Sequence, residues 1–318
     1  MGKTAIEWTD RVWNPVTGCT KVSEGCRNCY AEGIARRFWG ERKFSDVRIH
    51  PERLEQPIHW RKPSKIFVNS MSDLFHPAIF DDLGEETFID EIFAVMAATP
   101  WHTYQVLTKR ATAMRDYMND KRRAVYVEHS LETIYGEHGW CSPDFEWPLP
   151  NVWLGVSAED QQSANERIPV LLETEAALRF VSCEPLLEKV TIFDYLCGIC
   201  MDCYCGGLDI PPHDHEVQSR KIDWVICGGE SGPHARPMHP DWVRSLLDQC
   251  VEAENLQCES VPFFFKQWGE WTSEYPQGRN LAYIQMAYQN GLSFYRVGKK
   301  TAGALLNGVE YKLFPKED

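Results

Sequence analysis

The chain has 318 residues, of which 43% are hydrophobic and 25% are charged, and its formal net charge is −13. This composition excludes a disordered chain, and the length fits one large α/β domain or two smaller ones. The negative charge argues against nonspecific binding to a nucleic-acid backbone, which requires a basic surface. The sequence has neither an export signal nor an apolar run of membrane-spanning length, so we expect a cytoplasmic protein without membrane contact.

Three cysteines lie close together in the segment WNPVTGCTKVSEGCRNCYA, which begins at Trp13. Cys19, Cys26 and Cys29 form a C-x6-C-x2-C array. Thiolates at this spacing can bind one inorganic centre, and three protein ligands leave one position open, as a site that does chemistry requires. Half of a zinc knuckle and three unrelated buried thiols are the alternative interpretations. The tight spacing favours a metal or cluster site over unrelated thiols.

Beyond this loop, short apolar runs alternate with amphipathic segments. Strands are predicted around 12–16 and over 65–69, 103–107, 151–156, 178–182, 223–227 and 262–265. Helices are predicted over 30–39, 81–98, from about 111, and over 161–173 and 242–253. This alternation indicates βαβ units and a parallel sheet. Seven such strands favour an α/β fold with a complete or partial (β/α) barrel over an open doubly wound sheet.

Polar residues follow most of the predicted strands. In either arrangement, the carboxyl ends of parallel strands lie at one edge of the sheet, where active sites form. The residues at these ends are Ser70, Ser72, Asp73, Lys109, Ser157, Glu159, Glu184 and Glu230, together with Lys266 and Gln267. Any one of them could be a helix cap or a loop residue. As a group we expect them to face the cysteine loop and to bind a cofactor or substrate there.

Two segments interrupt the alternation. Residues 120–150 read as an insertion that covers the site, and the last part of 269–318 reads as a strand, a short helix and a strand. Thr301 is expected to cap that helix and Gly308 to end it. We therefore predict a barrel domain over 1–268 and a C-terminal extension over 269–318 that packs on it.

A second group of cysteines and histidines lies in an insertion at about 195–220. It consists of Cys197, Cys200, Cys203, Cys205, His213 and His215. Four of these six residues can complete a closed tetrahedral site, so a structural zinc ion is the leading interpretation. A second iron–sulfur cluster is the alternative, and a cysteine-rich insertion without metal is a third possibility.

Several motifs together resemble a known superfamily. The segment WNPVTGCTKVSEGCRNCYAE at the first predicted strand end is similar to the cluster loop of the radical S-adenosylmethionine (SAM) superfamily. With VLTKR, WLGVS, SCEPLL, GGESGPHARPMHPDWV and FFFKQWGEW, the chain most resembles an uncharacterised phage- and prophage-associated family of radical-SAM-like three-cysteine proteins. This resemblance covers nearly the whole chain.

The resemblance implies a cofactor and a reaction. Cys19, Cys26 and Cys29 would hold a [4Fe–4S] cluster whose fourth iron binds SAM, and the strand-end residues would contact SAM. The protein would be a radical SAM enzyme that takes an electron from a donor such as a flavodoxin or ferredoxin. Its substrate is unknown and could be a nucleotide or a nucleic acid. The alternatives are a non-catalytic zinc or iron–sulfur module that binds a ligand or partner at the barrel mouth, and a zinc-dependent hydrolase.

Overall fold

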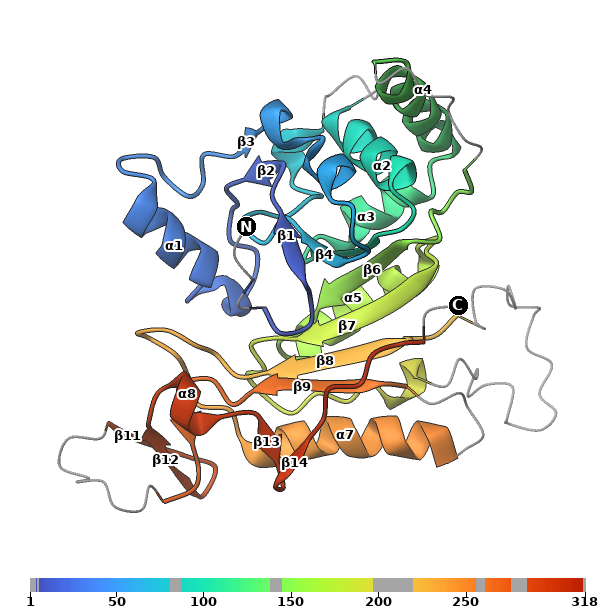
Figure 1. Cartoon of the computed structure of the whole chain (residues 1–318). Helices are drawn as coiled ribbons and strands as arrows, with labels where there is room; N and C mark the ends of the chain where they lie inside the picture. The colour runs from blue at the N-terminus through green and yellow to red at the C-terminus, as the bar shows by residue number, and fades with distance from the viewer. Residues whose placement is uncertain are drawn as a thin grey trace. The chain divides into compact units, whose positions relative to one another are not determined.

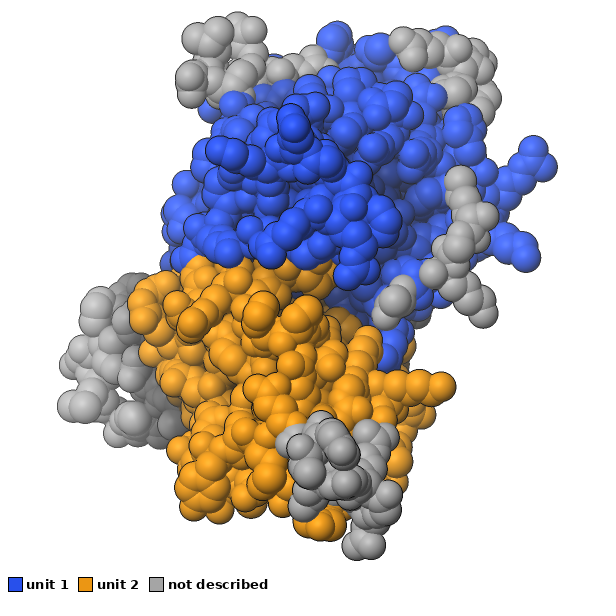
Figure 2. All heavy atoms as spheres, turned by 90° about the vertical axis from the view of Figure 1, so that its left-hand side faces the viewer, with its two compact units in different colours: residues 1–22, 31–156, 169–179 blue, residues 23–30, 157–168, 180–318 orange. Residues whose placement is uncertain are grey.

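The computed structural model describes residues 4, 6–80, 87–137, 145–196, 220–255, 261–275 and 285–316. The chain divides into two compact units, coloured blue and orange in Figure 2. Unit 1 contains residues 1–22, 31–156 and 169–179, and unit 2 contains residues 23–30, 157–168 and 180–318. The chain therefore enters and leaves each unit more than once. Among the described helices, none is both long enough and apolar enough to cross a bilayer.

Unit 1 is built on parallel strands. They are β1 (Arg11–Trp13), β4 (Lys65–Val68), β5 (Thr103–Thr108) and β6 (Val152–Ser157). β4 pairs with β1 and β5, and β5 pairs with β6, all in parallel register. Every residue of β6 is buried, as expected of a strand covered on both faces. A short antiparallel pair, β2 (Val16–Thr17) with β3 (Arg48–Ile49), precedes the cysteine loop and closes the long connection to β4.

Helices α1 (Tyr30–Phe38), α2 (Phe88–Ala98), α3 (Ala111–Met118) and α4 (Lys121–Glu137) belong to unit 1. Single turns of 3₁₀ helix cover Pro51–Arg53, Gln56–His59 and Pro77–Ile79. The start of α2 at Phe88 corrects the predicted start at 81: Thr87 is the N-cap, and Asp90 completes a capping box with it.

Helix α4 corrects the interpretation of residues 120–150 as an insertion over the site. It packs against α2 and α3, and Figure 1 shows the three helices grouped together. Val127, Leu131 and Ile134 recur at helical spacing and are buried. Residues 121–137 of this segment are therefore a core helix of unit 1.

Unit 2 contains three parallel strands and one long helix. The strands are β7 (Leu178–Cys183), β8 (Trp224–Gly228) and β9 (Phe263–Gln267), and β8 lies between the other two. Helix α7 (Pro240–Asn255) begins two residues earlier than predicted, because proline suits the first turn of a helix and His239 Nδ1 accepts a hydrogen bond from the Asp241 N–H. Helix α5 (Gln161–Glu173) continues through Pro169, and its residues up to Ile168 belong to unit 2 while the rest belong to unit 1.

The strands are ordered β1-β4-β5-β6-β7-β8-β9 in a seven-stranded sheet. The order of these strands in the sheet is the same as their order in the sequence, as in a (β/α) barrel. In a doubly wound sheet the strand order reverses at a switch point. Among the described strands, β1 and β9 form the two edges of the sheet, an arrangement compatible with a partial barrel.

The C-terminal residues of unit 2 form small antiparallel sheets. One contains β10 (Trp271–Thr272), β12 (Leu292–Arg296) and β11 (Met286–Gln289), and β13 (Leu305–Leu306) with β14 (Val309–Glu310) forms a hairpin. The short helix α8 (Lys299–Ala302) has Gly298 and Gly303 as its caps, so the predicted roles of Thr301 and Gly308 are wrong. Gly308 lies in the hairpin turn after Asn307, and both have positive φ, at 78° and 52°, as a tight hairpin turn requires.

Candidate functional site

The three loop cysteines are all half-buried, but they belong to different units. Cys19 follows β2 in unit 1, whereas Cys26 and Cys29 lie on the segment 23–30 of unit 2. In the part of the chain that the structure describes, no group of three or more histidine, cysteine or acidic side chains is arranged to hold a metal ion. The ligand role of the three cysteines stays a prediction, and the surroundings of each one are described within its own unit.

Asp73 is the centre of the polar network in unit 1. Its carboxylate accepts hydrogen bonds from the backbone N–H groups of Phe75 (3.0 Å) and Lys109 (3.1 Å), from Thr108 Oγ1 (2.7 Å) and from Arg110 Nη1 (2.8 Å). Asp73 is 6% exposed, so its charge is compensated by protein donors. The bond from the Lys109 N–H joins two of the residues selected at strand ends, and their role in cofactor binding stays a prediction.

Arg110 connects this network to Cys19. Its Nη1 lies 3.5 Å from Cys19 Sγ, and its Nη2 donates to both the carbonyl and the hydroxyl of Thr20, at 3.0 Å each. Burial opposes the charge of Arg110, but the Asp73 carboxylate and Cys19 outweigh it and raise the pKa of Arg110 above its usual value. His76 Nε2 also contacts Thr20 Oγ1, at 2.9 Å. Two side chains thus anchor the residue that follows Cys19.

Ser70 and Ser72 make local contacts in the same unit. Ser70 Oγ donates to Asn14 Oδ1 at 3.2 Å, and Ser72 Oγ donates to the carbonyl of Val16 at 3.1 Å. These bonds tie the end of β4 to the segment that leads into the cysteine loop. A role of either serine in cofactor binding stays a prediction.

In unit 2, Glu159 holds the segment that carries Cys26. Its carboxylate is fully buried, accepts a 2.8 Å hydrogen bond from Arg167 Nη1, and accepts another from Ser23 Oγ. Arg167 Nη1 also donates to the carbonyl of Ser157, at 2.8 Å, so Ser157 contributes its backbone to this network. Ser23 Oγ lies 3.9 Å from Cys26 Sγ. The buried Glu159–Arg167 pair therefore contacts the cysteine segment through Ser23.

Glu230 holds the other end of the same segment. It forms a two-pronged ion pair with Arg236, in which Nε and Nη2 donate at 2.9 and 2.7 Å. Asn28 Nδ2 donates to Glu230 Oε2 at 3.1 Å and to the carbonyl of His234 at 2.8 Å. The hydrogen bonds from Arg236 to Glu230 raise the pKa of Arg236. The segment is thus fixed on either side of Cys26, immediately before Cys29.

Glu184 pairs with the strand-end lysine of β9. Lys266 Nζ lies 3.1 Å from Glu184 Oε1, and both side chains are largely buried. Ser182 Oγ donates weakly to the same carboxylate, at 3.4 Å. The predicted acidic strand ends of unit 2 are thus all engaged with basic partners, and their role in cofactor binding stays a prediction.

Gly25 leaves no room for a side chain. A Cβ at this position would lie 2.6 Å from Glu159 Oε1, and the Glu159 carboxylate is held in place by Arg167. We expect Gly25→Ala to lower the free energy of unfolding by about 1–3 kcal/mol, because overpacking displaces a buried ion pair. Chemical denaturation measures this change. Gly33→Ala is the control, since a Cβ there meets nothing within 4 Å; equal losses in the two variants would contradict the expectation.

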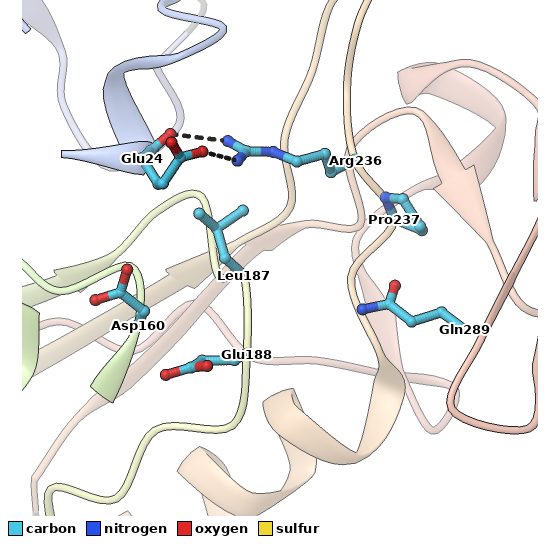
Figure 3. Close-up of a pocket in the computed structure, with 7 residues that line it drawn as sticks. All are labelled: Glu24, Asp160, Leu187, Glu188, Arg236, Pro237 and Gln289. Atoms are coloured by element: carbon cyan, nitrogen blue, oxygen red, sulfur yellow. Dashed lines mark hydrogen bonds and ion pairs between the residues drawn. The ribbon is translucent and has the colours of Figure 1, made fainter. Parts of the chain in front are cut away.

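A cavity of about 340 Å³ opens beside this segment in unit 2 (Figure 3). Its lining consists of Glu24, Asp160, Leu187, Glu188, Arg236, Pro237 and Gln289. The only guanidinium in this lining already contacts Glu24, with 3.4 Å between Nη1 and Oε2 and 3.1 Å between Nη2 and the carbonyl oxygen. Three carboxylates against one guanidinium favour a cationic ligand group and disfavour phosphate.

Three further cysteines of unit 2 are buried thiols. Cys183 and Cys227 are register partners on β7 and β8, and Cys250 of α7 lies near them. Burial raises the pKa of all three thiols, that of Cys250 to about 12. These thiols are therefore protonated at neutral pH, as expected of packing residues. The second cysteine and histidine group, Cys197 to His215, lies outside the described residues, and its zinc site stays a prediction.

A family model described as "Protein of unknown function (DUF5131)" matches residues 3–315. The chain belongs to the DUF5131 family. No curated protein and no solved structure matches it.

This result corrects the sequence-based assignment. The family that matches the chain is DUF5131, no radical SAM family matches it, and the predicted membership of the radical SAM superfamily is wrong. The C-x6-C-x2-C loop and the strand-end motifs therefore do not identify this DUF5131 chain as a radical SAM protein. No match links the chain to phages.

Sequence reasoning identified the acidic residues of this DUF5131 chain but missed their partners. Arg167, Arg236, Ser23 and Asn28 were not among the candidates, although each contacts one that was. The sequence holds a weak signal for Arg167, which lies eight positions after Glu159. Helix α5 spans most of that interval, so a predicted helix there keeps the two residues near each other. Nothing local connects Asn28 with Glu230, which is 202 residues away.

Proposed function

We propose that the chain is an enzyme that holds a [4Fe–4S] cluster on Cys19, Cys26 and Cys29 and uses it to cleave SAM reductively. When bound, such a cluster supplies one electron to the sulfonium of SAM, and the resulting 5′-deoxyadenosyl radical removes hydrogen from a substrate. The electron comes from a protein donor such as a flavodoxin or ferredoxin. The substrate is unassigned.

The donor set fits this cofactor. Iron–sulfur clusters are held by cysteine thiolates, and their properties depend on hydrogen bonds to the sulfurs and on solvent exposure. All three thiols are half-buried, and a guanidinium N–H of Arg110 points at one of them. Three ligands leave one position for a second molecule.

The observation that carries the proposal is the way unit 2 holds its two cysteines. Segment 23–30 is short, yet it contacts two carboxylates, Glu159 and Glu230, that are both neutralised by arginines. Burying such pairs costs free energy that packing alone would not require. Such a cost is expected where buried ion pairs must hold cysteines in a fixed geometry around an inorganic centre.

The acidic cavity supports SAM as the second molecule. Glu24 belongs to the 3₁₀ turn Glu24–Cys26 and also lines the cavity, so the cavity adjoins the cysteine segment. SAM carries a sulfonium and an ammonium group, and carboxylates attract both. Leu187 and Pro237 supply apolar contact in the same lining. The cavity thus suits a cationic molecule better than a nucleic-acid backbone.

The proposal is tested with the full chain, purified without oxygen and reconstituted with iron and sulfide. After reduction with dithionite and addition of SAM, we expect a brown protein that releases 5′-deoxyadenosine, measured by liquid chromatography. Cys29→Ala should lose nucleoside release, because it removes a ligand, whereas Cys250→Ala should retain it, because that thiol is buried in packing.

Two results would contradict the proposal. A colourless wild-type protein that holds only zinc and releases no nucleoside would favour a non-catalytic metal-binding module. Nucleoside release by Cys29→Ala at the wild-type rate would exclude the three-cysteine ligand set. The zinc content of the purified chain is measured in the same preparation.

A further inference from the structure

We propose that Arg110 is a positioning residue that tunes the cysteine centre: its guanidinium donates to Cys19 Sγ and makes the bound cluster easier to reduce. The inference rests on the proposed function, because it concerns the cluster that Cys19 would hold. Arg110 would touch neither SAM nor substrate in this role. It would act through the sulfur of a ligand and through the charge that it keeps beside that sulfur.

The geometry of Arg110 is fixed on unit 1. Nη1 lies between two acceptors, 2.8 Å from Asp73 Oδ2 and 3.5 Å from Cys19 Sγ, while Nη2 bonds twice to Thr20. The Arg110 side chain is 10% exposed and that of Asp73 is 8% exposed. Water therefore screens this charge only weakly, and although the Asp73 carboxylate offsets part of it, the N–H of Nη1 faces Cys19 Sγ directly.

Asp73 orients the guanidinium and has no spare capacity for a ligand. Three other donors hold its carboxylate: the N–H groups of Phe75 and Lys109 and the hydroxyl of Thr108. The last two come from the end of β5 and the first from the loop after β4, so the sheet itself sets the position of the carboxylate. A fixed carboxylate leaves the arginine fork one favourable orientation.

The chemical consequence follows from charge. Reduction adds one electron to a cluster, and the added negative charge spreads over its sulfurs. N–H groups that donate to a ligand sulfur, and a nearby positive charge, stabilise the reduced form and raise the reduction potential. Loss of Arg110 therefore makes the potential more negative. Arginine suits this task better than lysine, because its planar fork bonds Asp73, Thr20 and Cys19 together.

A purely structural role for Arg110 is the competing explanation. Arg110 also anchors Thr20, so under this explanation its loss only loosens the loop around Cys19. His76 Nε2 holds the same hydroxyl at 2.9 Å and remains in place in an Arg110 variant. Loosening changes how much cluster is bound and how stable the chain is. It does not by itself give a shift of potential in one direction.

The test uses the full chain reconstituted anaerobically with iron and sulfide. The midpoint potential of the cluster is measured by spectroelectrochemistry, with iron content and thermal unfolding recorded for the same samples. The variants are Arg110→Gln and Arg110→Lys. The matched control is Arg115→Gln, which removes a surface arginine on α3 that pairs with Glu173. We expect a more negative potential in R110Q, a smaller negative shift in R110K, and the wild-type potential in R115Q.

The outcomes separate this inference from the proposed function. Wild-type potentials in R110Q and R110K, at wild-type iron content, would overturn the inference while leaving SAM cleavage intact. A fall in iron content with no shift in the remaining cluster would assign Arg110 a structural role and also overturn it. If R110Q does not fold, R110K decides, because it keeps the charge and loses the fork. A wild-type chain that binds no cluster would refute the proposed function, and this inference with it.

Discussion

Replacing Glu159 by alanine is expected to lower the free energy of unfolding by about 3–5 kcal/mol, because it removes one partner of a buried ion pair. Glu159 is fully buried, and the Arg167 side chain is 8% exposed. The substitution leaves the guanidinium charged and desolvated, with the carbonyl of Ser157 as its one remaining hydrogen-bond partner among the described residues. Equilibrium unfolding in urea, followed by circular dichroism, measures the loss.

The same substitution should also release the cysteine segment. Ser23 loses its acceptor and the space beside Gly25 opens, so backbone amides of residues 23–30 should exchange hydrogen faster than in the wild type. Glu166→Ala is the control, since Glu166 is an exposed carboxylate on the same helix that contacts only Gln162 among the described bonds. If both variants lose less than about 1 kcal/mol, the value of an exposed pair, the buried pair is not what holds this segment.

Replacing Asp90 by alanine is expected to cost a similar amount, about 3–5 kcal/mol, in unit 1. Asp90 is fully buried and accepts hydrogen bonds from Thr87 (N–H at 2.7 Å), from the Tyr117 hydroxyl at 2.8 Å and from Arg123 Nη1 at 3.0 Å. Its loss removes the capping box of α2 and leaves the Arg123 charge without this partner.

Asp90→Asn separates charge from hydrogen bonding. It keeps one acceptor oxygen for Thr87 but cannot neutralise Arg123. We therefore expect its free energy of unfolding to lie between that of the wild type and that of Asp90→Ala. Asp116→Ala, which removes a carboxylate that is 61% exposed, should change stability by less than about 1 kcal/mol. Thermal and urea unfolding give the ranking, and an Asp90→Ala variant as stable as Asp116→Ala would contradict this account.

The strands were predictable because buried parallel strands read as continuous apolar runs. The runs at 103–107 and 178–182 correspond to β5 and β7 within one residue. The first strand was less accurate: β1 ends at Trp13, because Pro15 has no N–H to donate to a ladder. The sequence did not predict helix α4 although Val127, Leu131 and Ile134 recur at helical spacing, because the same stretch of 120–150 also contains prolines and many aromatic residues, which are typical of an irregular insertion.

The sequence predicts where the acidic residues of the candidate site lie, but it does not predict which side chains bond to them. Parallel strands bring their carboxyl ends to one edge, so acidic residues at those ends could be selected from the sequence. Which arginine neutralises each of them depends on contacts between distant segments, such as Asn28 with Glu230, that no local pattern encodes. The superfamily assignment failed for a related reason: a three-cysteine loop and short strand-end motifs indicate a kind of site but do not specify a family.

The division of the cysteine loop between the two units has a consequence for synthesis on the ribosome. Ser23 bonds to a residue 136 positions later, and Asn28 to one 202 positions later. At translation rates of about 5–20 residues per second, the partner of Asn28 is made roughly 10–40 s after Asn28 itself. Before Glu159 is made, the segment lacks both of these bonds, and until Glu230 is made it still lacks the one to Asn28, so the nascent chain carries Cys26 and Cys29 on a segment that is not yet fixed. Loading of an inorganic centre is therefore a late event, and a fragment that ends before Glu230 should lack the bond that holds Asn28 beside Cys29.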